Sequence, residues 1–323
     1  MQSELRRYVP CLRWKQGEYQ ALLHLSPEMR DAIVPLIEVA EIGFDFETRE
    51  PCKSIDKHLN AFAKRMLDKW GQRNCFVDMK LIGPCERMAD GKHPAAFVFD
   101  DLRSKGILAI PTLNLRQDTG LRAAIKEASD KDGRGVCLRV RLEEAGNPHI
   151  RSSVDKLLSS VGTMAEQCDF ILDMEAPNFE PLDGLAGLLE ILVSGLPHLD
   201  SWRSIGLIGT SFPASMAELP MGLSTVRRSE WQLYKNLAVR LARQGLRLPS
   251  FGDYVISHPA VALMYMRFVK PSASLRYTVD DGWLSQEAPM SGTTSSSNTE
   301  DSVRRLWIPD PMGDRHSRLA IST

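Results

Sequence analysis

The sequence predicts an α/β protein: a (β/α)8 barrel of the TIM type with a short β-hairpin and tail appended at its C-terminal side. Short, nearly continuous apolar segments alternate with amphipathic segments of helical periodicity between residues 8 and 256. The apolar segments start about 35 residues apart on average, which suits one strand and one crossover helix. Apolar strands of this kind are typical of a parallel sheet covered by helices, and eight such units favour a closed barrel.

An open, doubly wound sheet is the alternative arrangement of the same elements. Such sheets often bind nucleotides through a glycine-rich phosphate loop, and the sequence contains no G-x-G-x-x-G or Walker pattern. The closed barrel is therefore preferred, and no nucleotide cofactor is expected.

The strands are expected, in order, at residues 8–14, 33–39, 74–80, 107–114, 135–142, 168–175, 204–211 and 250–256. Helix starts follow from capping residues. Ser26-Pro27 is typical of a cap and first helical position, and Ser54 precedes a long apolar helix face that stops at Gly71. Further starts are expected at Pro94, Thr119, Ser153 and Asp183, and at the capping box Ser229-Glu-Trp-Gln232.

Three parts are expected along the chain. Residues 1–258 form the barrel, and residues 259–289 form a hairpin packed on it, built from Leu275–Thr278 and Trp283-Leu284. Residues 290–323 begin with a Ser/Thr/Asn-rich stretch and are expected to be a flexible linker and C-terminal tail.

Composition narrows the class of protein. The 323 residues are 43% hydrophobic with a formal net charge of −1, which argues against a dedicated DNA-coating surface but leaves local nucleic-acid contacts open. Apolar runs are too short to span a membrane, and the N-terminus lacks the apolar core of a signal peptide. Six cysteines occur without a C-x-x-C pair, and no H-x-H or H-E-x-x-H occurs, so zinc is not expected. A cytoplasmic location with reduced thiols is predicted.

Polar side chains gather where the predicted strands end. The segment Cys168–Glu175 is the clearest case, because alternation along a strand puts Asp173 and Glu175 on one side. Two carboxylates there are costly to bury and need compensation. The C-terminal ends of barrel strands carry active sites. The side chains expected at these ends are Lys15, Glu38, Asp78, Lys80, Asn114, Arg139, Arg141, Asp173, Glu175, Ser211 and Asp253.

One interpretation is catalytic. Carboxylate oxygens suit Mg2+ or Mn2+, and the metal ligands would be Glu38, Asp78, Asp173 and Glu175. An anionic, phosphate-bearing substrate or nucleotide would be bound by Asn114, Arg139, Arg141, Ser211 and Asp253, since arginine offers a bidentate fork. Metal-activated water would hydrolyse a phosphoric ester, with the catalytic set Lys15, Asp78, Lys80, Asp173 and Glu175.

Two other interpretations use the same residues. The charges form an ion-pair network that fills a polar barrel mouth, in which case nearly every charge needs a partner. Alternatively the mouth is a recognition module that binds a protein partner or a nucleotide without chemistry. Direct contact of Asp173 and Glu175 with Arg or Lys favours the network, whereas convergence with Glu38 or Asp78 on an open pocket favours catalysis.

Four sequence segments together resemble the Beta protein family. They are Tyr8-x-Pro10-x-Leu12-x-Trp14-Lys15 with Gly17-Glu18, Pro35–Glu38, Arg228–Trp231 with Phe251–Tyr254, and Ser274–Thr278 with Trp283. The family is named for a T-even phage protein and is found widely in bacteria, often near phage and mobile-element genes. The resemblance therefore implies a phage-related or anti-phage role. It supports the unity of the chain and supplies no catalytic residues.

Overall fold

The computed structural model describes residues 7–45, 47–214, 222–255, 257–260, 272–289 and 320–322. The chain divides into two compact units. The first comprises residues 1–212 and 229–259, and the second comprises residues 213–228 and 260–323.

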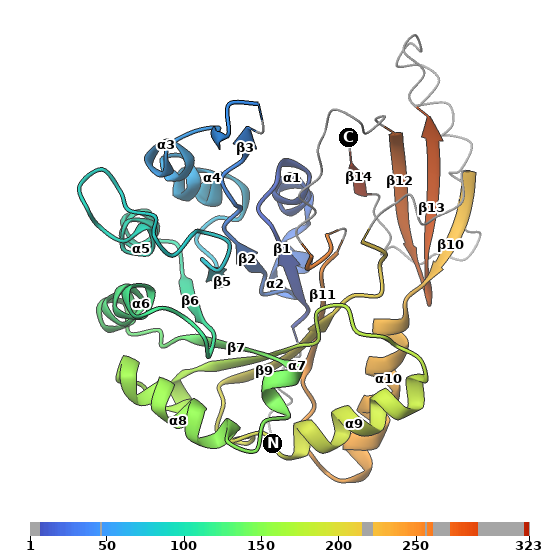
Figure 1. The fold of residues 1–323 in the computed structure, drawn as a ribbon. Helices are drawn as coiled ribbons and strands as arrows, with labels where there is room; N and C mark the ends of the chain where they lie inside the picture. The colour runs from blue at the N-terminus through green and yellow to red at the C-terminus, as the bar shows by residue number, and fades with distance from the viewer. Residues whose placement is uncertain are drawn as a thin grey trace. The chain divides into compact units, whose positions relative to one another are not determined.

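The first unit is a closed barrel of eight parallel strands surrounded by helices (Figure 1). Its strands are β1 (Val9–Leu12), β2 (Leu36–Glu38), β5 (Cys75–Asp78), β6 (Ala109–Leu113), β7 (Cys137–Arg141), β8 (Asp169–Asp173), β9 (Ser204–Gly209) and β11 (Ser250–Asp253). Around the barrel the order is β1-β11-β9-β8-β7-β6-β5-β2, and β1 pairs in parallel with both β2 and β11. The predicted (β/α)8 barrel is confirmed.

Helices follow the strands. They are α1 (Gln16–His24), α2 (Pro27–Asp31), α3 (Ile55–Leu59), α4 (Phe62–Lys69), α5 (Pro94–Ser104), α6 (Thr119–Asp132), α7 (Leu142–Ala145), α8 (Ile150–Val161), α9 (Leu182–Ser194) and α10 (Ser229–Arg243). A small hairpin, β3 (Phe44–Asp45) with β4 (Glu50–Pro51), lies between α2 and α3 in the chain.

Most predicted helix starts are confirmed, with three differences. Ser26 and Ser54 cap α2 and α3, each accepting the backbone N–H three residues on. The helix expected from Ser54 to Gly71 is two helices, α3 and α4. Asp118 rather than Thr119 caps α6, because its carboxylate accepts the N–H of Leu121 at 2.9 Å. Ser153 lies inside α8, which begins at Ile150.

Apolar side chains form two layers in this unit. A small cluster fills the barrel itself: Val9, Cys11, Leu36, Phe76, Ile110, Cys137, Ile171, Ile208 and Tyr254. A larger cluster lies between the strands and the helices, and along β5 it takes Val77 while Phe76 points inside. This alternation means that the inward residues that follow the apolar layer, at the C-terminal strand ends, face a shared space.

The second unit contains a four-stranded antiparallel sheet in the order β10-β13-β12-β14. Its strands are β10 (Gly222–Arg227), β12 (Ser272–Val279), β13 (Gly282–Pro289) and β14 (Ala320–Ser322). The predicted C-terminal hairpin is confirmed as β12 and β13. Its boundaries differ from the prediction, because β10 comes from the crossover between β9 and α10 and pairs with β13 along its length. An isolated two-stranded hairpin is marginal in water, and added strands stabilise it.

Two further expectations concern the C-terminal tail and membrane-spanning segments. The expected flexible segment lies outside the described residues, apart from β14. Among the helices that the structure describes, none has the length and apolar character required to cross a membrane.

Candidate functional site

The inward residues at the C-terminal strand ends converge on one buried arginine. Arg139 of β7 donates from Nε to Asp173 of β8 at 2.8 Å. Its Nη1 donates at 2.8 Å to both Glu38 of β2 and Asp78 of β5. Its Nη2 donates to the hydroxyl of Tyr254 at 2.8 Å. These five residues are called the Arg139 network below, and each is at most 4% exposed.

Three acidic and three basic groups balance in and beside this network. Lys80 Nζ lies 2.7 Å from Glu38 Oε1, and Arg13 Nε lies 3.6 Å from Glu38 Oε2. Burial by itself raises the pKa of Glu38, but the charges of Arg139 and Lys80 outweigh burial and lower that pKa from 4.5 to about 2. Glu38 is therefore ionised at neutral pH, and a buried carboxylate is tolerated because cations surround it.

Tyr254 is the member of the network that sequence reasoning missed as a site residue. It follows β11 directly, and its hydroxyl lies 2.7 Å and 2.9 Å from the two carboxylate oxygens of Asp173. Burial raises the pKa of the phenol well above its usual value, so the hydroxyl keeps its proton and donates a hydrogen bond to Asp173. Period-two alternation along β11 could have identified Tyr254, because it puts this side chain on the same side as Gly252, which faces the inside of the barrel.

The acids at the strand ends also terminate the strands. Asp78, Asp173 and Asp253 each accept the backbone N–H of the residue two positions on, at 2.8–2.9 Å. Asn114 accepts the N–H of Arg116 in the same way at 3.0 Å. Such Asx turns give the chain a hydrogen bond where the strand ladder stops. The repeated strand-end carboxylates therefore have a structural cause that is independent of any ligand.

Basic strand ends are tied to the helices that follow. The backbone N–H of Lys15 donates to Glu18 at 3.2 Å, and that of Arg141 donates to Glu144 at 3.0 Å. Each glutamate lies in the first turn of its helix and is buried. These hydrogen bonds fix the backbone of Lys15 and Arg141 and leave the charged ends of their side chains unused.

Two predicted substrate-binding residues have other partners. Asp253 accepts a hydrogen bond from the hydroxyl of Tyr8, which precedes β1. Ser211 donates to the buried carboxylate of Glu230 at the start of α10, and its Oγ accepts the N–H of Ser229 at 3.0 Å. The structure thus places both residues where they anchor chain segments.

The remaining predicted residues form a more exposed rim. Side-chain exposure is 24% for Lys80, 40% for Arg141 and 57% for Lys15. Arg141 lies 3.7 Å from Glu143, and Lys15 lies 3.7 Å from Glu41, both beyond hydrogen-bond distance. Asn114 and Glu175 are half-buried. Ion pairs as long and exposed as those of Lys15 and Arg141 contribute little stability, so both cations can bind another anion at low cost in free energy.

Three of the five described non-glycine residues with positive φ lie at the same end of the barrel, and the other two are Arg49 and His198. Trp14, Glu175 and Val255 follow β1, β8 and β11, and their φ angles are +51°, +54° and +53°. Left-handed backbone costs a non-glycine residue about 1–2 kcal/mol, and it is rarest for a β-branched residue such as Val255. Strain of this kind is typical of binding and catalytic sites.

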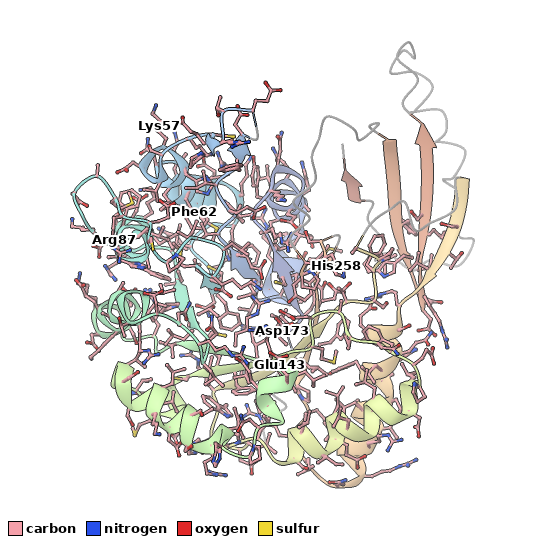
Figure 2. All side chains as sticks on the ribbon, in the orientation of Figure 1. Lys57, Phe62, Arg87, Glu143, Asp173 and His258 are labelled. Atoms are coloured by element: carbon pink, nitrogen blue, oxygen red, sulfur yellow. The ribbon has the colours of Figure 1, made fainter. Side chains whose placement is uncertain are left out.

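The predicted metal ligands do not fit a divalent ion in this arrangement. The guanidinium of Arg139 occupies the point toward which Glu38, Asp78 and Asp173 converge, and it already carries their counter-charge. Within the described part of the chain, no group of three or more His, Cys, Asp and Glu side chains is arranged to hold a metal ion. Figure 2 shows Asp173 in the middle of the barrel, whereas Lys57 and Arg87 lie at its periphery.

The chain is similar in structure to several solved proteins. One is a triosephosphate isomerase from Bartonella henselae, with 12% sequence identity over 76% of this chain and 91% of that one and a TM-score of 0.36. A second is a 2,3-dimethylmalate lyase of the PEP mutase/isocitrate lyase superfamily, with 9% identity over 77% of this chain and 75% of that one and a TM-score of 0.38. A third is active domain 2 of a chitinase from Pyrococcus furiosus, with 8% identity over 77% of this chain and 83% of that one and a TM-score of 0.36. Likenesses this distant carry no argument about function, and the barrel assignment rests on strand topology.

No curated protein sequence matches the chain. The sequence profile described as Beta protein matches residues 8–314. That match spans the barrel and extends into the second unit, and it includes all four segments on which the resemblance was noted. The chain therefore belongs to the Beta protein family.

Proposed function

We propose that the C-terminal mouth of the barrel recognises a phosphate-bearing small molecule, such as a nucleotide, without catalysing its hydrolysis. The observation that carries this proposal is the set of three left-handed, non-glycine residues, Trp14, Glu175 and Val255, at the ends of three strands. Left-handed backbone of this kind clusters at binding and catalytic sites, which supports a binding role for this end of the barrel.

The class of ligand follows from the rim. Lys15, Lys80 and Arg141 are partly exposed cations at the ends of β1, β5 and β7, and the ion pairs that Lys15 and Arg141 form with described residues are both 3.7 Å long. Beneath them the Arg139 network is buried and fully hydrogen-bonded at the guanidinium, and its three carboxylates are balanced by Arg139 together with Lys80 and Arg13. A buried, charge-balanced floor under the exposed cations Lys15 and Arg141 suits a phosphate group, for which arginine supplies paired donors.

Recognition is favoured over metal-assisted hydrolysis because the carboxylates are already engaged. Asp78 and Asp173 each serve Arg139 with one oxygen and an Asx turn with the other. Neither is left as a general base or a ligand unless Arg139 moves. The proposal includes the phage-related or anti-phage role that the family resemblance implies. In that role the protein would bind a nucleotide as a signal.

Isothermal titration of the full chain with pyrophosphate and ATP tests the proposal. We expect saturable binding that weakens about tenfold or more in Arg141→Ala, because a hydrogen bond to a charged group contributes about 1.5–3 kcal/mol. Lys15→Ala should weaken it as well. Arg151→Ala, which removes an exposed arginine on α8, is the matched control and should bind as the parent does.

Two results would overturn the proposal. One is the absence of saturable binding of either compound to the parent. The other is unchanged affinity in Arg141→Ala. Repeating the titration with Mg2+ or Mn2+ and assaying phosphate release distinguishes the hydrolytic interpretation, which predicts metal-dependent turnover that is lost in Asp173→Asn.

A further inference from the structure

A cavity of about 300 Å3 lies at the opposite, N-terminal end of the barrel. Its walls come from the first residues of β1, β5, β6, β8, β9 and β11 and from the segments that precede them. Every lining residue belongs to the first unit. Well-packed interiors contain few voids larger than one water molecule, and this volume matches the lower range of small-molecule sites.

The inner wall of the cavity is apolar. Val9, Phe76, Ile110 and Ile171 line it, and all four belong to the cluster that fills the barrel. Gly206 of β9 adds space, because it presents no side chain between Ile171 and Val9. A Cβ built there would meet Ile171 at 3.4 Å and Val9 at 3.8 Å, which are ordinary contacts. Glycine is therefore not required sterically at this position, and its absence of a side chain keeps the cavity open.

The outer rim is polar and basic. It carries three guanidinium groups, from Arg7, Arg203 and Arg247, against one carboxylate, from Asp169. Asp169 is 3% exposed and accepts from Arg203 Nε at 3.1 Å and from Ser204 Oγ at 2.7 Å. Arg247 donates to the carbonyl oxygen of Arg203 at 3.1 Å, which fixes the two arginines together. The rim is thus a built, positively charged edge above an apolar wall.

We propose that this N-terminal cavity binds a small organic monocarboxylate. The apolar chain lies among Val9, Phe76 and Ile171, and the carboxylate lies at the arginine rim. An apolar wall with a few polar groups at one end selects an amphipathic ligand. Arg203 is neutralised by Asp169, so the excess positive charge comes from Arg7 and Arg247, and it selects an anion.

Titration of the full chain with straight-chain carboxylates from butanoate to octanoate tests this proposal. Affinity should rise about fourfold for each added methylene until the cavity is full, equivalent to about 0.8 kcal/mol per group. Hexanamide, which has nearly the shape of hexanoate without its charge, should bind at least tenfold more weakly.

Gly206→Val fills the space at the inner wall and should abolish binding. Gly187→Val on α9, where a Cβ meets nothing within 4 Å, is the matched control and should leave binding unchanged. Arg7→Ala at the exposed rim provides a second test that does not depend on core packing, and it should weaken hexanoate binding at least fivefold relative to Arg151→Ala.

Three outcomes would overturn the proposal: no saturable binding of any carboxylate to the parent, equal binding of the amide, or parent-like binding in both Gly206→Val and Arg7→Ala. The test is independent of the function proposed for the opposite end of the barrel. Arg141→Ala should leave carboxylate binding intact, so failure at one end does not decide the other.

Discussion

Replacing Arg139 with methionine tests whether the charge network holds the barrel mouth together. Methionine retains much of the apolar length of arginine but removes the charge and every donor. Three buried carboxylates, Glu38, Asp78 and Asp173, then lose their shared partner. Lys80 and Arg13, both paired with Glu38, remain beside them.

The magnitude follows from Glu38. Its pKa falls from 4.5 to about 2 in the folded protein, which corresponds to about 3.4 kcal/mol at about 1.36 kcal/mol per pKa unit. Lys80 supplies part of that effect, but Arg139 also serves two further carboxylates. Removing one partner of a buried ion pair typically costs about 3–5 kcal/mol. We therefore expect Arg139→Met to lower the free energy of unfolding by about 3–5 kcal/mol at pH 7.

The dependence on pH gives a sharper signature. In the parent the folded pKa of Glu38 lies below its unfolded value, so this contribution is fully present above pH 4.5 and is lost as the pH falls toward 2. In Arg139→Met, burial without the arginine favours protonated carboxylic acids in the folded state. The stability of the variant should therefore rise as the pH is lowered from 7 to 5, where the Glu38 contribution in the parent does not change.

Urea unfolding followed by far-ultraviolet circular dichroism at pH 7 and pH 5 measures both effects. Arg151→Met, an exposed substitution, should stay within about 0.5 kcal/mol of the parent. Adding Asp173→Asn to Arg139→Met should recover part of the loss, because it removes one stranded charge. A loss below about 1 kcal/mol at pH 7, or the same pH response in parent and variant, would refute the reasoning.

Three more predictions follow from the same structure. Asp173→Asn should lower the free energy of unfolding by about 2–4 kcal/mol, because it weakens contacts with Arg139 and Tyr254 and removes one of the negative charges that balance the buried arginine. Mg2+ should not shift the melting temperature of the parent, and a metal-dependent shift that is lost in the variant would contradict this. Gly135→Ala should destabilise the protein far more than Gly133→Ala. Both glycines have positive φ, but at Gly135 a Cβ would lie 2.0 Å from the carbonyl oxygen of Gln167, whereas at Gly133 it would meet nothing within 4 Å. In urea unfolding the loss at Gly133 should be about 1 kcal/mol, and similar losses at both positions would contradict the packing described. A thiol reagent should rapidly label only Cys52 and Cys85 in the folded protein, because the other four cysteines are buried and burial raises the pKa of Cys75 to about 12. The double variant Cys52→Ser with Cys85→Ser should lose this rapid labelling, and rapid labelling of any other cysteine would contradict the burial described.

The order of strands and helices, the closed barrel and the hairpin could be predicted from the sequence because they depend on local patterns. Period-two and helical hydrophobic spacing is visible in any window of residues, and capping residues such as Ser26 and Ser54 act within three positions. Alternation also predicted correctly that Asp78, Arg139 and Asp173 face the same space. The sequence did not reveal β10 as part of the second sheet, because pairing with β13 joins segments about 60 residues apart.

The meaning of the charged strand ends was decided by tertiary structure alone. Five acids and four bases at strand ends are equally compatible with a metal site, a ligand site and an ion-pair network. The choice depends on which side chain reaches the centre, and Arg139 reaches it through contacts such as that with Glu38, 101 positions away in the chain. Tyr254 joins the network across 115 positions. Local sequence carries the charges of these groups but not the distances between them, and those distances determine which groups neutralise each other and which remain for a ligand.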